Sequence, residues 1–146
     1  MIRCSERPEK GRKYQFRPGA YGLLIRDGAA LVTFKADPEA EFQLPGGGVD
    51  PGESPIHALH REAREETGWT LSTPRWIGAY RRYCYMQDED VWAEKLCSVW
   101  LARPVLQVGP PRDPAHSAHW VAPRELTRIL ADPGARQIAG RLLAFG

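Results

Sequence analysis

The segment from Ser54 to Gly68 constrains this chain more than any other, because both ends of a helix are marked in it. Ser54 is a favourable N-cap residue, and Pro55 stands at the first helical position, where its missing N–H leaves no bond unmade. Gly68 supplies the left-handed residue that commonly ends a helix. Apolar residues recur at helical spacing between these ends and predict a stripe that faces the core: Ile56, Leu59 and Ala63.

Three carboxylates share one face of this predicted helix. Glu62, Glu65 and Glu66 are spaced i, i+3 and i+4, so they lie within roughly 100° of arc. Like charges at this spacing repel one another and destabilise a helix, and a divalent cation would offset that repulsion. Oxygen ligands favour hard ions, so the pattern predicts Mg²⁺ or Mn²⁺ and not zinc.

The glycine-rich stretch before the helix, Gly46 to Gly48, supports the same interpretation. Glycine lets the backbone approach a ligand closely, and a loop that enters a helix N-terminus favours anions. Carboxylates that hold a cation beside such a loop predict a site for a metal-bound pyrophosphate. The expected chemistry is displacement at phosphorus, in which the metal activates water and a spare carboxylate takes the proton.

Residues 47–69 resemble the signature of the Nudix hydrolase family, G-x5-E-x7-R-E-U-x-E-E-x-G-U, where U is apolar. Every specified position is filled in order and spacing, by Gly47, Glu53, Arg61, Glu62, Ala63, Glu65, Glu66, Gly68 and Trp69. Ala63 is small and Trp69 is large for an apolar position of the pattern, but neither is a ligand position. The preceding Leu44-Pro45-Gly46 and an upstream hairpin are also similar to Nudix domains.

The resemblance implies an α/β fold, a Nudix-type α/β/α sandwich with a mixed sheet, in which this box forms a loop–helix–loop. It also implies the roles of the box residues. Glu62 and Glu66 would be metal ligands, with Glu65 shared between metal binding and proton transfer, so the general base is either Glu62 or Glu65. The Gly46 carbonyl would be a further ligand. Four residues would hold the shape of the box: Gly47, Glu53, Arg61 and Gly68.

The rest of the chain predicts one domain over residues 17–146 after an N-terminal arm, residues 1–16. Asp27-Gly28 between two apolar runs, residues 20–26 and 29–35, predicts a hairpin. Further strands are expected at residues 76–85, 96–102 and 119–121, and helices at residues 124–130 and 136–145. Four prolines predict an irregular loop over residues 103–115.

Several residues outside the box are assigned roles as hypotheses. Glu94, just before a predicted strand, is the preferred extra metal ligand, whereas Asp88–Asp90 is interpreted as a solvated loop. Arg81 and Tyr85 are predicted to bind substrate. In having a tyrosine at about this position, Tyr85, the sequence resembles the dinucleoside polyphosphate hydrolases of the family. His116 and His119 are expected to be exposed loop residues without a specific role.

Composition excludes several other classes of function. A net charge of +2 does not favour a nucleic-acid or membrane partner, and no apolar run is long enough for a bilayer span. The cysteines are three in number and widely spaced, which predicts reduced thiols and a cytoplasmic protein. Cys84 and Cys97 are expected to be small buried apolar residues.

These observations predict a Mg²⁺-dependent pyrophosphohydrolase whose substrate is a nucleoside diphosphate linked to a further group. The favoured substrate is a nucleoside or deoxynucleoside triphosphate or a related nucleotide, including nucleotide-sugar-type molecules. Two alternatives stay open: a dinucleoside polyphosphate hydrolase, and a Nudix domain that binds nucleotides without hydrolysing them.

Overall fold

Two long strands, β2 (Gln15–Arg26) and β8 (Val91–Ala102), run side by side through the centre of the molecule and pair in parallel. The computed structural model describes residues 4–36 and 40–144. Within them, eight strands form one mixed sheet in the order β1-β7-β8-β2-β3-β10, with β4 on β3 and β5 on β2. The remaining strands of this sheet are β1 (Cys4–Ser5), β3 (Ala29–Lys35), β4 (Glu41–Gln43), β5 (Gly46–Gly48), β7 (Arg75–Met86) and β10 (His116–Val121).

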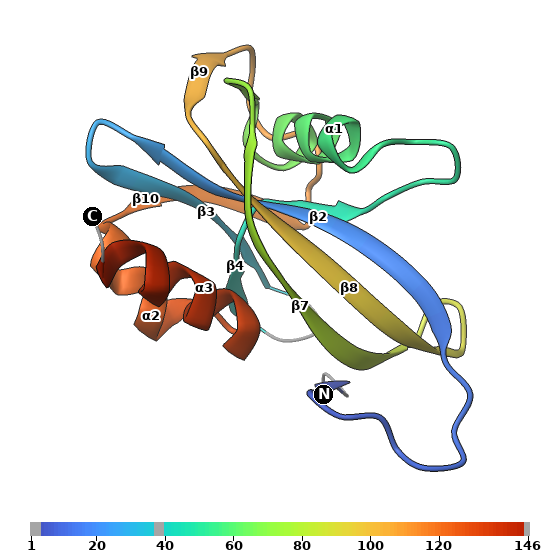
Figure 1. Ribbon diagram of the computed structural model, residues 1–146. Coiled ribbons are helices and arrows are strands. Elements are labelled where there is room, and N and C mark those ends of the chain that lie inside the picture. The colour runs from blue at the N-terminus through green and yellow to red at the C-terminus, as the bar shows by residue number, and fades with distance from the viewer. Residues whose placement is uncertain (1–3, 37–39, 145–146) are drawn as a thin grey trace.

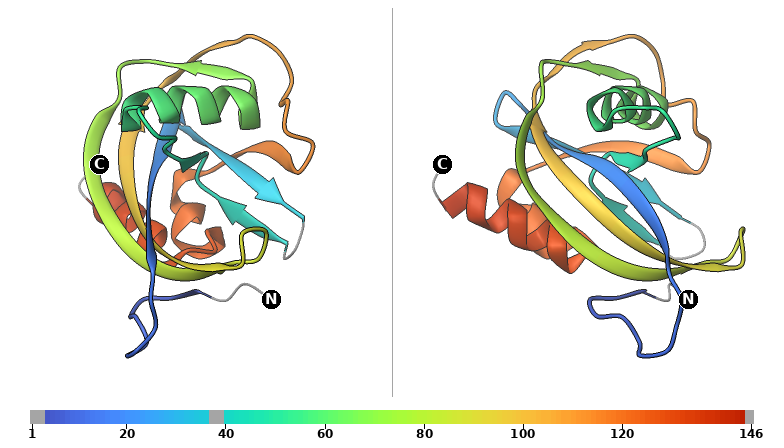
Figure 2. Two further views of the ribbon diagram at one scale, coloured as in Figure 1. Left: turned by 90° about the vertical axis from the view of Figure 1, so that its right-hand side faces the viewer. Right: turned by 45° about the vertical axis from the view of Figure 1, so that its right-hand side comes forward.

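Helices cover both faces of this curled sheet (Figures 1 and 2). Helix α1 (Pro55–Thr67) lies on one face, and α2 (Leu126–Ile129) and α3 (Pro133–Ala144) lie on the other, after a short 3₁₀ turn, Pro123–Glu125. The predicted α/β/α sandwich is therefore confirmed. No helix in the described part of the chain is long and apolar enough to cross a bilayer.

The buried centre of the sheet supplies a core to each helical layer. Neighbouring strand residues point to opposite faces, so Leu23 packs in the cluster of Leu126 and Ile138, whereas Leu24 packs with Ala63 of α1. Leu59 is fully buried in a third cluster under α1. Burial of each large aliphatic side chain contributes roughly 1.5–3 kcal/mol, which holds the box helix to the sheet.

The local signals of the sequence are visible in this structure. The Ser54 hydroxyl accepts a hydrogen bond from His57 N at 3.1 Å, and Gly68 ends α1 in the left-handed region with φ 79°. Asp27 and Gly28 also have positive φ, 50° and 79°, and join β2 to β3. The expected core stripe of α1 is wrong at Ile56, which is 38% exposed, and holds at Leu59 and Ala63, which are buried.

Two further expectations need correction. The loop predicted at residues 103–115 contains a strand, β9 (Pro104–Gln107), which pairs with β6 (Trp69–Leu71) beyond the end of α1. Prolines are tolerated there because this small two-stranded sheet has free edges.

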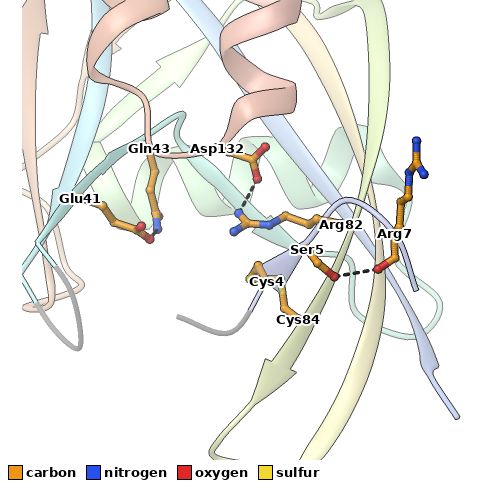
Figure 3. Close-up of a disulfide and its surroundings, with 8 residues drawn as sticks. All are labelled: Cys4, Ser5, Arg7, Glu41, Gln43, Arg82, Cys84 and Asp132. Atoms are coloured by element: carbon orange, nitrogen blue, oxygen red, sulfur yellow. Dashed lines mark hydrogen bonds and ion pairs between the residues drawn. A yellow bond between two sulfur atoms is a disulfide. The ribbon is translucent and has the colours of Figure 1, made fainter. Parts of the chain in front are cut away.

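Cys4 and Cys84, which were expected to be reduced, form a disulfide (Figure 3). The cause is register, because Cys4 lies directly opposite Cys84 when β1 pairs with β7. Cys97 is a free, buried thiol, as expected.

Candidate active site

A charged clamp holds the loop that leads into α1. Arg61 donates two hydrogen bonds to the Glu53 carboxylate, at 2.8 and 2.9 Å, and a third to the Gly48 carbonyl at 3.1 Å. Glu53 also accepts a bond from Asp50 N at 3.0 Å. The Arg61 hydrogen bonds hold the pKa of Glu53 at about 2, well below its ordinary value. Arg61, in the middle of the helix, is thereby bonded to both ends of the loop, at Gly48 and at Glu53.

Glu62 is the first box carboxylate that this clamp positions. Arg61 Nη1 donates to Glu62 Oε1 at 2.9 Å, and the Glu62 carboxyl group lies against the backbone of Gly47. A Cβ atom at Gly47 would be only 2.8 Å from Glu62 Cδ, so no side chain fits at this position without displacing the carboxylate. Burial raises the pKa of Glu62, in opposition to the Arg61 hydrogen bond.

Glu66 lies deeper, one helical turn further along α1. It is 5% exposed, and its Oε1 accepts a hydrogen bond from Gly46 N at 3.1 Å. Burial, followed by the nearby Glu62 charge, raises the pKa of Glu66 to about 9, in opposition to the hydrogen bond from Gly46. A carboxylate in this position is costly to ionise unless a cation approaches it.

Glu65 occupies a different position. Its side chain is 42% exposed, and its nearest charged partner is Arg61 Nη1 at 3.6 Å from Oε2. Glu62 and Glu66 line the main cleft, whereas Glu65 lies outside this lining. The structure thus brings two of the three predicted ligands together and leaves the third at the rim.

The cleft beside these carboxylates has a volume of about 480 Å³ and is bounded by β5, α1 and the cleft-facing side of β7 and β8. Gly46 and Gly47 line it, as does Tyr85, one of the two predicted substrate-binding residues. The Tyr85 hydroxyl donates to the Asp90 carboxylate. The cleft is acidic at α1 and carries basic side chains on its floor: Lys35, Arg82 and Lys95.

The structure does not bring Arg81 or Glu94 into this cleft. The two side chains pair with each other, at 2.5 Å between Arg81 Nη1 and Glu94 Oε2, and neither lines the cleft. Their strand neighbours Arg82 and Lys95 line it instead. Since successive strand residues point to opposite faces, a prediction displaced by one residue selects the wrong face.

Sequence reasoning also missed His116 and Asp113. His116 is not an exposed loop residue, because it begins β10 and only 9% of its side chain is exposed. Its Nε2 lies 3.9 Å from Glu66 Oε2, and its Nδ1 lies 2.8 Å from Asp113 Oδ2. The short spacing between Asp113 and His116 is compatible with their contact, but nothing near them in the sequence indicates Glu66, 50 residues earlier, as a neighbour.

The chemistry of these groups fits a hard divalent cation. In residues 4–36 and 40–144, no three acidic, histidine or cysteine side chains already stand at the separations of a metal centre. However, the partly buried Glu62 and the buried Glu66 together offer four carboxylate oxygens. Arg61 donates to Glu62 and not to Glu66, so this cation does not balance both charges. Oxygen-only donors of this kind favour Mg²⁺ or Mn²⁺.

Known proteins share sequence similarity with about half of this chain. Over 77 residues, the chain is 31% identical to a Bacillus subtilis protein whose name attributes to it an 8-oxo-dGTP diphosphatase activity; the match covers 53% of this chain and 52% of that protein. Over 73 residues it is 46% identical to an RNA pyrophosphohydrolase of Helicobacter pylori, covering 43% and 47%. The chain therefore spans about half the length of the curated relatives it matches.

Solved structures share the fold. A NUDIX hydrolase from Nitrosomonas europaea superposes with a TM-score of 0.71 at 21% identity, covering 90% of both chains. A MutT NUDIX hydrolase from Burkholderia pseudomallei gives 0.70 at 23% identity, covering 88% of this chain and 98% of that one. The family model of the NUDIX domain matches residues 15–142, which is most of the sequence. On this match, the chain belongs to the Nudix hydrolase family.

Proposed function

We propose that this protein is a pyrophosphohydrolase that requires a divalent cation and cleaves a phosphoanhydride bond of a nucleoside or deoxynucleoside triphosphate or a related nucleotide. One observation carries the proposal: the partly buried Glu62 and the buried Glu66 face a cleft beside the glycine backbone of β5. Family membership, and relatives named for diphosphatase and pyrophosphohydrolase activities, support it.

Glu62, Glu66 and Glu65 would hold the cation, with the Gly46 carbonyl as a further ligand. When bound, Mg²⁺ would neutralise phosphate charge and lower the pKa of a water molecule. The residues of the chain supply the remaining functions. The backbone of Gly46 and Gly47 lets phosphate approach α1 closely, and the Arg61–Glu53 clamp keeps Glu62 in place. Glu62 or Glu65 takes the proton of the attacking water.

The test is release of phosphate or pyrophosphate from a panel of nucleotides with Mg²⁺, comparing the wild type with Glu66→Gln. We expect turnover of one substrate class and a loss of several orders of magnitude in the variant. Glu94→Gln is the matched control, because Glu94 pairs with Arg81 away from the cleft, and it should keep turnover within about threefold of the wild type. Tight nucleotide binding without turnover of any substrate would favour the non-catalytic alternative.

A second candidate, hydrolysis of dinucleoside polyphosphates, is favoured by a second groove of about 580 Å³ beside the main cleft. The groove runs between the start of β2 and the loop before α1, and the exposed Phe16 ring lines it. Four residues line both hollows: Tyr21, Gly48, Met86 and Lys95. A substrate with a nucleoside at each end of its phosphate chain would place one nucleoside in the main cleft and the other in the second groove. Preferential turnover of such compounds in the same panel would establish this alternative.

A further inference from the structure

Three basic side chains form a row across the centre of the sheet. Arg82 of β7 lies opposite Lys95 of β8, and Lys95 lies opposite Arg17 of β2. Directly opposed residues of neighbouring strands point to the same face, here the face of the cleft. Like charges in this arrangement destabilise a sheet, so a row of three cations requires an explanation.

The two outer cations of this row are neutralised, but the middle one is not. Arg82 pairs with the Asp132 carboxylate (Figure 3), and Arg17 pairs with Glu89. The Lys95 ammonium group has no hydrogen-bond or ion-pair partner among the described residues 4–36 and 40–144. Burial lowers the pKa of Lys95, and Arg82 lowers it further. The ammonium group is therefore held in an unfavourable environment that an anion would relieve.

The position of Lys95 indicates which anion. Lys95 lines both the main cleft, which contains Glu62 and Glu66, and the second groove beside it. A phosphate chain that reaches from the box carboxylates toward the second groove must pass the place where the two hollows meet. A lysine ammonium at that junction is a compact charge with three donors, well suited to phosphate oxygens of variable geometry.

We infer that Lys95 binds the phosphate chain of the substrate at the junction of the two hollows and so determines how the chain is placed across the box carboxylates. This inference rests on the proposed function, because it takes a phosphoanhydride as the ligand. Lys95 acts as a binding and positioning residue, whereas Arg82 and Arg17 are occupied by their ion pairs with Asp132 and Glu89.

Two effects of opposite sign separate this role from a structural one. In Lys95→Met, which keeps an unbranched side chain as far as Cε and removes the ammonium group, relief of the cationic row should raise the melting temperature by about 1–4 °C. The same variant should bind phosphate more weakly. A lysine needed only for folding would lower the melting temperature instead.

The experiment is calorimetric titration with imidodiphosphate, which has no hydrolysable bridging oxygen, in the presence of Mg²⁺. Loss of one charged hydrogen bond predicts affinity about 10–100-fold weaker in Lys95→Met, and Lys95→Arg should recover most of it. Arg81→Met, a neighbouring cation on the opposite face, should bind as the wild type does. Wild-type affinity in Lys95→Met, or no binding by the wild type, would overturn the inference.

The outcome is distinguishable from failure of the proposed function. If the wild type binds imidodiphosphate through Lys95 but turns over no nucleotide, the hydrolase proposal alone fails. If nucleotides are hydrolysed and Lys95→Met keeps both probe affinity and KM, the inference about Lys95 alone fails. A raised KM with little change in kcat for Lys95→Met supports binding of the phosphate chain in ground and transition states alike.

Discussion

Substitution of Gly47 by alanine should inactivate the protein without unfolding it. The added Cβ would stand 2.8 Å from Glu62 Cδ and 2.9 and 3.0 Å from its two oxygens. Carbon atoms in contact prefer about 3.5–4.0 Å, so the carboxylate must retreat by roughly 0.7–1.2 Å. It cannot retreat freely, because Arg61 holds Glu62 at 2.9 Å and Glu53 in turn holds Arg61.

A catalytic group misplaced by about 1 Å costs on the order of 100-fold in rate, or about 2.7 kcal/mol of transition-state stabilisation. We therefore expect kcat/KM of Gly47→Ala to fall by about two orders of magnitude on whichever nucleotide the panel identifies. The atoms that must move belong to the end of a side chain, so the cost to folding should stay near about 1–3 kcal/mol. Steady-state kinetics and thermal melting of the same preparation measure both quantities.

The neighbouring residue supplies the control. No heavy atom outside its chain neighbours lies within 4 Å of a Cβ built on Gly48, although Gly48 belongs to the same strand and precedes the same helix. Gly48→Ala should keep kcat/KM within about threefold of the wild type. Equal losses in the two variants would show that loop flexibility, and not the space beside Glu62, explains the effect. Full activity in Gly47→Ala would refute the reasoning outright.

Three further predictions concern stability. Leu59→Ala should lower the free energy of unfolding in urea by about 2–5 kcal/mol, because Leu59 is fully buried, whereas Ile56→Ala, at a 38% exposed site, should cost under about 1 kcal/mol. The folded-state pKa of Glu66 is raised from 4.5 to about 9, so ionisation of Glu66 opposes folding. The free energy of unfolding of the metal-free protein should therefore fall as the pH rises between these values. Urea titrations should show a flatter pH dependence for Glu66→Gln. Reduction of Cys4–Cys84, which are 80 residues apart, should cost about 2–5 kcal/mol, so dithiothreitol should lower the melting temperature of the wild type and leave a Cys4→Ser, Cys84→Ser variant unchanged.

Signals carried by adjacent residues were sufficient to predict the parts of this fold that depend on local chemistry. Ser54 and Gly68 mark the ends of α1 through bonds within one helical turn, and Asp27-Gly28 needs only its own positive φ to form the hairpin. The glutamates of the box could likewise be placed on one helical face, because the period of a helix fixes their spacing.

Features that depend on a distant strand could not be predicted in the same way. The choice of Arg81 over Arg82 requires knowing which face of β7 is covered, and that depends on the pairing of β7 with β8. In the same way, Glu94 was predicted to belong to the site, whereas its strand neighbour Lys95 lines the cleft. His116 lies beside Glu66, which is 50 positions away in the sequence, so no pattern around His116 could indicate this contact.

The parallel pairing of β2 with β8 has a consequence for the order of events during synthesis. Residues Gln15 to Leu24 leave the ribosome early, yet their partners, Ala93 to Ala102, follow more than 75 residues later. Contacts so distant in sequence form slowly, and intermediates with unpaired strand edges are prone to aggregate. The acidic helix α1 is complete well before the strand that carries Lys95 exists. A nascent chain that stops before Val91 contains every residue of the box but lacks Lys95, one of the three basic side chains on the floor of the cleft.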